Sequence, residues 1–191
     1  MESAGLTPEE KINRINSLLQ EINDQVNSGE IDCADLPVIR LPFHLMSGEG
    51  AFRTRKKFIK KLIVRKNLTS HLVLSDFFRW IMERTSAYGK LEEMLIKFQI
   101  INLYAISITV IHELCTDHGT YAKSLDELLS KGIINREIHE EMIWLLDFRS
   151  GIQLGVMSEK EYGKYKPEHF HRANGAVTVF LEAIESIALN D

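Results

Sequence analysis

The feature that most limits the fold is a long apolar stretch at residues 90–117, KLEEMLIKFQIINLYAISITVIHELCTD. Its middle, residues 98–111, is apolar around the whole circumference of a helix, which is typical of a helix surrounded by others in a bundle. This middle contains Asn102, Ser107 and Thr109 and is flanked by charges. It is also shorter than the roughly 20 apolar residues that cross a membrane. We therefore expect a buried central helix and no membrane span.

Composition and charge place the chain among ordinary globular proteins. Its 191 residues are 45% hydrophobic and 26% charged, which suits one large domain or a domain with an appendage. A net charge of −4 excludes a uniformly basic nucleic-acid-binding protein. Cys33 and Cys115 are too few for a disulfide framework and lack the spacing of a zinc site. The N-terminus has no apolar signal-peptide core. We expect a cytoplasmic location, and neither a metal nor a cofactor.

The N-terminal segment predicts a separate helix followed by a linker. Thr7 with Pro8 and Glu10 forms a capping box with proline in the first turn, and Ser28-Gly29 predicts the end near Asn27. Residues 30–50 contain two prolines and two glycines, as linkers do. Residues 1–50 are thus expected to form an extension to a helical bundle at 51–191. The helix has an apolar stripe that should pack on something: Ile12, Ile15, Leu18, Leu19, Ile22 and Val26.

Residues 51–66, AFRTRKKFIKKLIVRK, carry eight cations and no acid. We predict a helix here, with one apolar face that includes Phe52, Phe58, Ile59, Leu62 and Ile63. Two interpretations remain open for the opposite face: contacts with nucleic-acid phosphates or a partner, or a solvated face whose cations pair with acids elsewhere. The candidate binding residues are Arg53, Arg55, Lys56, Lys57, Lys60, Lys61, Arg65 and Lys66.

The rest of the chain predicts further helices. A turn is expected near Lys66-Asn67, then a helix that starts at Ser75 or Asp76. A capping box at Ser124–Glu127 predicts a short helix ending at Gly132. Asn135 should cap the next helix, which ends at Ser150-Gly151, and a last helix should begin near Pro167. No strand alternation or repeat is present, so the fold class is all-α: a helical bundle with a long central helix and an N-terminal helical extension. The stripe expected to be buried in the helix that Asn135 caps is Ile138, Met142, Leu145 and Leu146.

From about residue 90 to 189, this order of helices resembles the HEPN superfamily of helical bundles, including the toxins of nucleotidyltransferase-linked toxin–antitoxin pairs. The family signature is an arginine, commonly followed by asparagine, with a histidine a few residues later. Arg149 matches the arginine, Ser150 stands in place of the asparagine, and Leu154 falls where the histidine is expected. The resemblance implies a homodimer that cleaves or binds nucleic acid, with the signature histidine missing. A turn like Gly132–Asn135 before an arginine-bearing helix is also similar to mannitol-operon repressor-like regulators.

The missing histidine limits the chemistry. Metal-independent RNA cleavage needs a group that titrates near neutrality and a cation for the developing negative charge. Arg149 would supply the cation, and His169 or His171 could act as a displaced base. Alternatively, Arg149 only complements the helix dipole, and the histidines are solvated or bind a partner. Two His-Glu pairs, at 112–113 and 139–140, lack the repeated Glu-x-x-His pattern of bundle metal sites.

Three functions therefore remain open. The favoured one is a non-catalytic, HEPN-like protein that binds nucleic acid or a protein partner in a bacterial defence, toxin–antitoxin or regulatory system. The second is a ribonuclease that uses Arg149 with a displaced histidine. The third is a structural subunit or a transcriptional regulator of the mannitol-operon repressor type. An enzyme is the less expected outcome, and the only enzyme expected is a ribonuclease.

Overall fold

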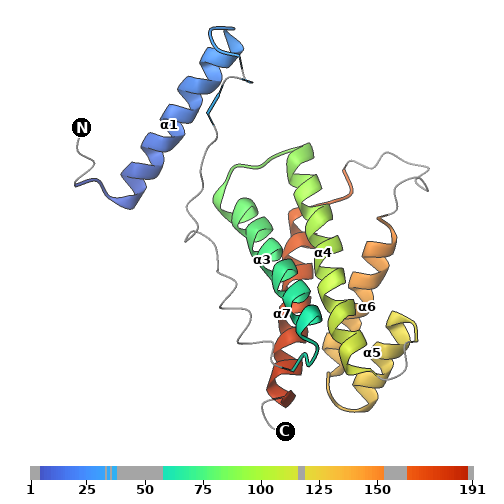
Figure 1. The fold of residues 1–191 in the computed structure, drawn as a ribbon. Helices are drawn as coiled ribbons and strands as arrows, with labels where there is room; N and C mark the ends of the chain where they lie inside the picture. Colours follow the sequence, from blue (N-terminus) through green and yellow to red (C-terminus); the bar gives the residue numbers. More distant parts are fainter. Residues whose placement is uncertain are drawn as a thin grey trace. The chain divides into compact units, whose positions relative to one another are not determined.

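The computed structural model describes residues 5–32, 34, 36–37, 58–115, 119–152 and 163–188 (Figure 1). The described residues form helices and no strands, which confirms the all-α fold class. The chain divides into two compact units, Met1–Pro42 and Phe43–Asp191. The predicted boundary at 50/51 lies outside the described residues. The helices are α1 (Pro8–Asn27), α3 (Leu62–Arg84), α4 (Lys90–Leu114), α5 (Tyr121–Ser130), α6 (Arg136–Ser150) and α7 (Pro167–Ala188).

In the first unit, α1 begins and ends as its sequence predicts. The Thr7 hydroxyl accepts a hydrogen bond from the Glu10 N–H at 3.2 Å, and the Glu10 carboxylate accepts one from the Thr7 N–H at 2.7 Å. These bonds lower the pKa of Glu10. Gly29, with φ of 77°, follows the C-terminal cap at Ser28. The expected apolar stripe is present, but α1 buries no residue. The described residues of the first unit therefore leave the stripe uncovered.

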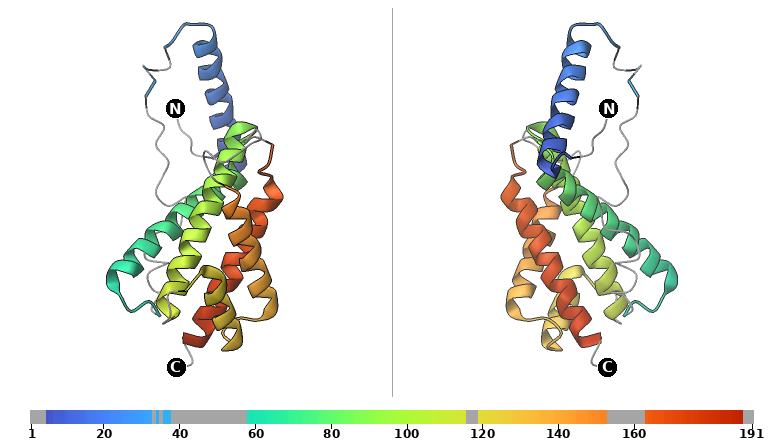
Figure 2. Two further views of the ribbon diagram at one scale, coloured as in Figure 1. Left: turned by 90° about the vertical axis from the view of Figure 1, so that its right-hand side faces the viewer. Right: turned by 90° about the vertical axis from the view of Figure 1, so that its left-hand side faces the viewer.

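The second unit is built around α4, as predicted. This helix contacts α3, α5, α6 and α7 (Figure 2). Its side chains supply much of the core, and Ile96, Ile100 and Ile106 have no exposed surface. By length and composition alone α4 could cross a membrane, but 56% of its most apolar 18-residue window is buried inside the fold. A central bundle helix has the same properties.

Polar side chains on α4 hold the neighbouring helices in register. The buried Gln99 side-chain amide donates to the Ser75 hydroxyl on α3 and to the Asn174 side-chain carbonyl on α7, each at 2.7 Å. Among the described residues its own carbonyl oxygen has no partner. One turn further on, Asn102 donates to the His71 backbone carbonyl at 2.9 Å. Because breaking a hydrogen bond to a buried amide is costly, these bonds disfavour other arrangements of α3 and α7 on α4.

The predicted helix at 51–66 is wrong at residues 58–61 and confirmed at residues 62–66, and the predicted turn after it is wrong. Residues 58–61 are not helical, and α3 then continues through both the predicted turn and the predicted new start at Ser75 or Asp76. Arg65 explains its late beginning, because its guanidinium donates two hydrogen bonds, at 2.6 and 3.0 Å, to the Ile59 carbonyl. Ile59 is buried as expected, whereas Leu62 and Ile63 are 62% and 65% exposed. Residues 51–57 lie outside the described part.

The later helices follow the sequence with one exception. Helix α5 starts at Tyr121, because the Thr120 hydroxyl caps it, and the predicted cap Ser124 is buried inside the helix. The Tyr121 hydroxyl also lies 2.9 Å from that of Ser107, which holds the first turn against α4. Helix α6 is capped by Asn135 and α7 begins at Pro167, both as predicted. In the predicted stripe of α6, Ile138, Met142 and Leu145 are buried and Leu146 is half-buried.

Candidate functional site

Arg149 lies in the last turn of α6 and packs on an aromatic side chain. Its guanidinium carbon is 5.1 Å from the centroid of the Tyr104 ring on α4, within the range of a cation–π contact. The Tyr104 ring in turn packs against Tyr121, with centroids 5.1 Å apart. Arg149 itself is half-buried. Its side chain thus links the end of α6 to α4, and its charge complements the C-terminal end of the α6 dipole.

The two candidate histidines belong to the first turns of α7. The His169 ring packs against Phe148 of α6, with centroids 4.5 Å apart, and its Nδ1 accepts a hydrogen bond from the Lys166 N–H at 3.1 Å. His171 is exposed and meets Phe170 edge-on. Within the described residues no hydrogen bond joins either histidine to Arg149. Helix α6 directs Arg149 to α4 and Phe148 to α7, and Leu154 lies outside the described part.

Four of the eight candidate cations of the basic segment are described: Lys60, Lys61, Arg65 and Lys66. Lys61 forms an ion pair of 3.1 Å with Glu113 on α4, and Arg65 is bonded to the Ile59 carbonyl. Lys60 and Lys66 are exposed. The contact of Lys61 fits the interpretation in which cations pair with acids elsewhere, whereas Arg65 binds a backbone carbonyl. Arg53, Arg55, Lys56 and Lys57 lie outside the described residues.

The His-Glu pairs considered as metal ligands are used in pairwise contacts. His139 on α6 lies 2.9 Å from the Asp126 carboxylate on α5, and Glu140 accepts from Arg136 within its own helix at 2.9 Å. Glu113 is the partner of Lys61. The described residues contain no group of three or more side chains that could hold a metal ion.

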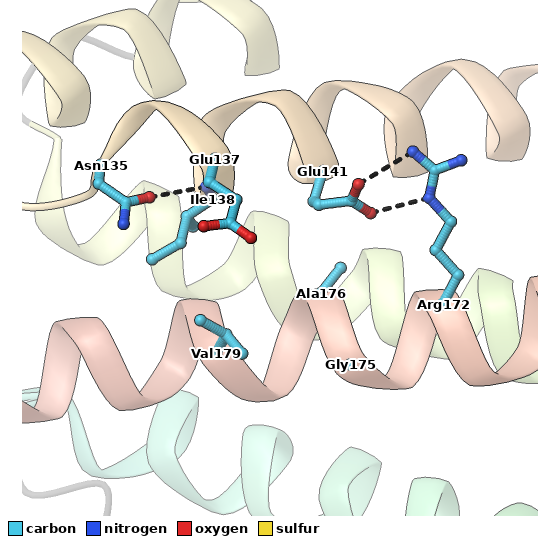
Figure 3. Close-up of a pocket in the computed structure, with 8 residues that line it drawn as sticks. All are labelled: Asn135, Glu137, Ile138, Glu141, Arg172, Gly175, Ala176 and Val179. Carbon is cyan, nitrogen blue, oxygen red and sulfur yellow. Dashed lines mark hydrogen bonds and ion pairs between the residues drawn. The ribbon is translucent and has the colours of Figure 1, made fainter.

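A groove between α6 and α7 is the site that the sequence did not reveal (Figure 3). It has a volume of about 310 Å³. At one end the Arg172 guanidinium donates two hydrogen bonds, at 2.8 and 3.0 Å, to the Glu141 carboxylate, which raises the pKa of Arg172. The guanidinium carbon also lies 4.1 Å from the centroid of the Trp144 ring. The groove is lined by Asn135, Glu137, Ile138, Glu141, Arg172, Gly175, Ala176 and Val179.

The groove has an apolar floor and an acidic rim. Gly175 leaves its centre open, since a Cβ atom placed there meets no atom within 4 Å. Val179 is 49% exposed and adds an apolar side chain to the open surface of the groove. On the rim, Glu137 has no ion-pair partner among the described residues. The lining holds no nucleophile beside a general base, so it suits binding better than chemistry. Only the small residues 175 and 176 in α7 could have indicated it from the sequence.

Comparison with protein-family models, with curated proteins and with solved structures found no match to this chain.

Proposed function

We propose that this chain is a non-catalytic helical protein of HEPN-like layout that acts by binding a protein partner. The observation that carries the proposal is the packing of the two best candidates for catalysis. Arg149 is stacked over Tyr104, and His169 packs on Phe148 with one ring nitrogen already bonded. A general base must lie within reach of the proton it removes, and these contacts direct the two side chains to different helices.

The groove between α6 and α7 supports a protein partner over a nucleic acid. Glu141 is paired with Arg172, so the charge of Glu137 leaves the lining with a net negative charge that would repel a phosphate backbone. Its floor of Ile138, Ala176 and Val179 offers apolar surface next to the aromatic ring of Trp144. We expect the occupant to be a helix that places an apolar side chain over Gly175 and a lysine or arginine against Glu137. The HEPN-like layout suggests a defence, toxin–antitoxin or regulatory role for such a pair.

The non-catalytic part is tested by incubating the purified full-length chain with total RNA. The wild type, Arg149→Ala and His169→Ala should all leave the RNA intact over the same period. Cleavage by the wild type that Arg149→Ala abolishes would establish the ribonuclease and refute this part of the proposal. Cleavage that both variants retain, and that persists on further purification, would come from other groups such as His171 and would also refute this part of the proposal.

The binding part is tested by isolating the tagged chain from cells that produce it naturally and quantifying the proteins bound to it. Glu137→Lys and Gly175→Trp should each reduce the partner by about tenfold or more, as at the centre of an interface. Glu140→Lys is the matched control, since it makes the same charge change on α6 at a residue that pairs with Arg136 and does not line the groove. Equal capture by all variants would refute the groove as the docking surface. Bound material that is removed by nuclease and by salt would indicate a nucleic-acid partner instead.

A further inference from the structure

The exposed stripe of α1 has the spacing of a coiled-coil seam. Its apolar residues follow one another at intervals of three and four: Ile12, Ile15, Leu19, Ile22 and Val26. The first four are 56%, 50%, 41% and 37% exposed, although the helix is otherwise complete and well capped. Leu18 is the one apolar residue of the stripe outside this alternation, which is otherwise typical of a seam that another helix covers, whereas helices that pack on a broad globular surface carry a wider stripe. We infer that α1 pairs in antiparallel orientation with α1 of a second copy of the chain.

The seam is complementary to itself when the second helix runs in the opposite direction. Ile12 then lies opposite Ile22 of the partner subunit, and Ile15 lies opposite the partner's Leu19. Each layer occurs twice, related by a two-fold axis, so that this alignment uses four of the five seam residues and closes the dimer, while Val26 lies opposite Pro8 of the partner subunit. Leu18, which is 48% exposed beside the seam, meets the partner's Leu18 near this axis. An exposed leucine outside the regular spacing is thereby also covered.

The charges beside the seam fit this orientation. The flanking positions on one side are Glu9, Asn16 and Asn23, and in the antiparallel pair Glu9 faces Asn23 of the partner subunit. On the other side Lys11 faces the partner's Gln25, so no like charges face each other across the seam. The two helix dipoles also oppose, which is favourable.

A parallel pair fits less well. It would bring the two acidic first turns, each with Glu9 and Glu10, next to each other. Isoleucine at both Ile15 and Ile22, the second apolar position of each repeat, also disfavours a parallel two-stranded coiled coil.

A membrane surface is the other occupant that an amphipathic helix can suit. Helices that lie on membranes carry mostly lysine and arginine on the polar face. The polar face of α1 has Lys11 and Arg14 but more acids than bases, with Glu9, Glu10, Glu21 and Asp24. Anionic lipid would repel this face, so a second α1 is the better partner.

Sedimentation equilibrium of the full-length chain over roughly a hundredfold range of micromolar concentrations tests the pairing. The wild type should approach twice its mass of 22.0 kDa. Leu19→Lys places a charge in the seam and should raise the dissociation constant at least about tenfold. Ser17→Lys makes the same addition on the opposite side of α1 and should dimerise as the wild type does. A wild type that stays monomeric, or equal association of the two variants, would overturn the inference.

Cysteine cross-linking tests the orientation, and it does so even if Leu19→Lys unfolds α1. In a Cys33→Ser, Cys115→Ala background, Leu18→Cys should form a disulfide-linked dimer on mild oxidation, because the two positions differ by about 3 Å in height along the pair. Ile12→Cys should remain monomeric, since its two copies are about 15 Å apart along the pair. The reverse result would overturn the antiparallel arrangement.

Flotation with vesicles of neutral and anionic lipid tests whether α1 binds a membrane surface instead. We expect the chain not to bind either kind of vesicle. If the wild type is monomeric and binds vesicles, and Leu19→Lys abolishes this binding, the partner of α1 is a membrane and not a second copy of the chain. The inference does not rest on the proposed function, because α1 contributes no residue to the α6–α7 groove. Loss of pairing would therefore leave the results with Glu137→Lys and Gly175→Trp unchanged.

Discussion

Replacing Arg149 with alanine should destabilise the second compact unit, residues 43–191, whether or not the chain has any activity. The contact between its guanidinium and the Tyr104 ring is partly buried, and such contacts contribute about 0.5–1 kcal/mol, or more where water is excluded. A cation in the last turn of a helix adds about 0.3–1 kcal/mol. We therefore expect the free energy of unfolding to fall by about 1–2 kcal/mol.

A double-mutant cycle with Tyr104→Leu isolates the stacking contact. The double variant should lose less unfolding free energy than the sum of the two single losses, by about 0.5–1 kcal/mol. The reason is that removing either side chain already removes the contact. Arg149→Lys is the conservative control, since it keeps the charge at the helix end but loses the planar group that stacks. Urea unfolding followed by tryptophan fluorescence is the suitable assay. The only two tryptophans, Trp80 and Trp144, both lie in the second compact unit, so that unfolding of α1 does not contribute to the fluorescence change.

Two results would refute this reasoning. If the single effects add to within about 0.3 kcal/mol, Arg149 does not stack on Tyr104 in solution. If Arg149→Ala leaves the stability unchanged and abolishes cleavage of RNA, the arginine is held free for chemistry and the proposed function fails with it. Destabilisation with full coupling and no cleavage supports the structural role.

Three further predictions concern stability. Gly175→Ala should raise the free energy of unfolding by about 0.5–1 kcal/mol, measured in urea, because alanine favours a helix and its methyl group meets open space. Burial raises the pKa of Tyr121 above its ordinary value, so the folded state holds this proton more tightly than the unfolded state. Stability should therefore fall as pH rises above about 10, and less steeply in Tyr121→Phe. Gln99→Glu should cost several kcal/mol at neutral pH, since the buried carboxylate lacks donors, and the loss should shrink as pH falls toward about 4 in paired urea titrations with Gln99→Met.

Local signals predicted the helix ends that depend on local contacts. The capping box at Thr7 and the cap at Asn135 are made by residues three positions away, and the structure contains both. Proline at 167 has no N–H to donate, so the start of a helix is one of its few stable places. The central position of α4 was equally readable, because a helix that is apolar on all sides must be surrounded.

The errors occur where distant residues decide between two local solutions. Thr120 and Ser124 are both acceptable caps, and the contact of Tyr121 with Ser107 on α4 favours the earlier start of α5. In the same way the start of α3 depends on the bonds from Arg65 to the Ile59 carbonyl, which anchor a buried isoleucine outside the helix. A helical projection of the sequence contains no information on either contact.

The candidate site was only partly predictable for the same reason. The sequence identifies Arg149 by its place at the end of an apolar helix, but the ring beneath it belongs to α4. The groove is even harder to predict from the sequence, because its walls come from two helices and its opening depends on the absence of a side chain at Gly175. In the sequence Glu137 is one of many acidic residues. It lies at the rim of the groove only because α6 packs against α7.

The positions of these features along α6 allow their functions to be separated. Glu137 lies in the first turn and Arg149 in the last, and twelve helical residues span about 18 Å. Effects of substitutions at sites that far apart, with no shared partner, are expected to add. A variant at Glu137 should therefore change partner binding without touching the contact with Tyr104, and Arg149→Ala should do the opposite. Because α1 belongs to the other compact unit, self-association is a third property that can be lost alone. Any single substitution that removed two of the three would show that the surfaces are coupled, as in a composite site formed by two copies of the chain.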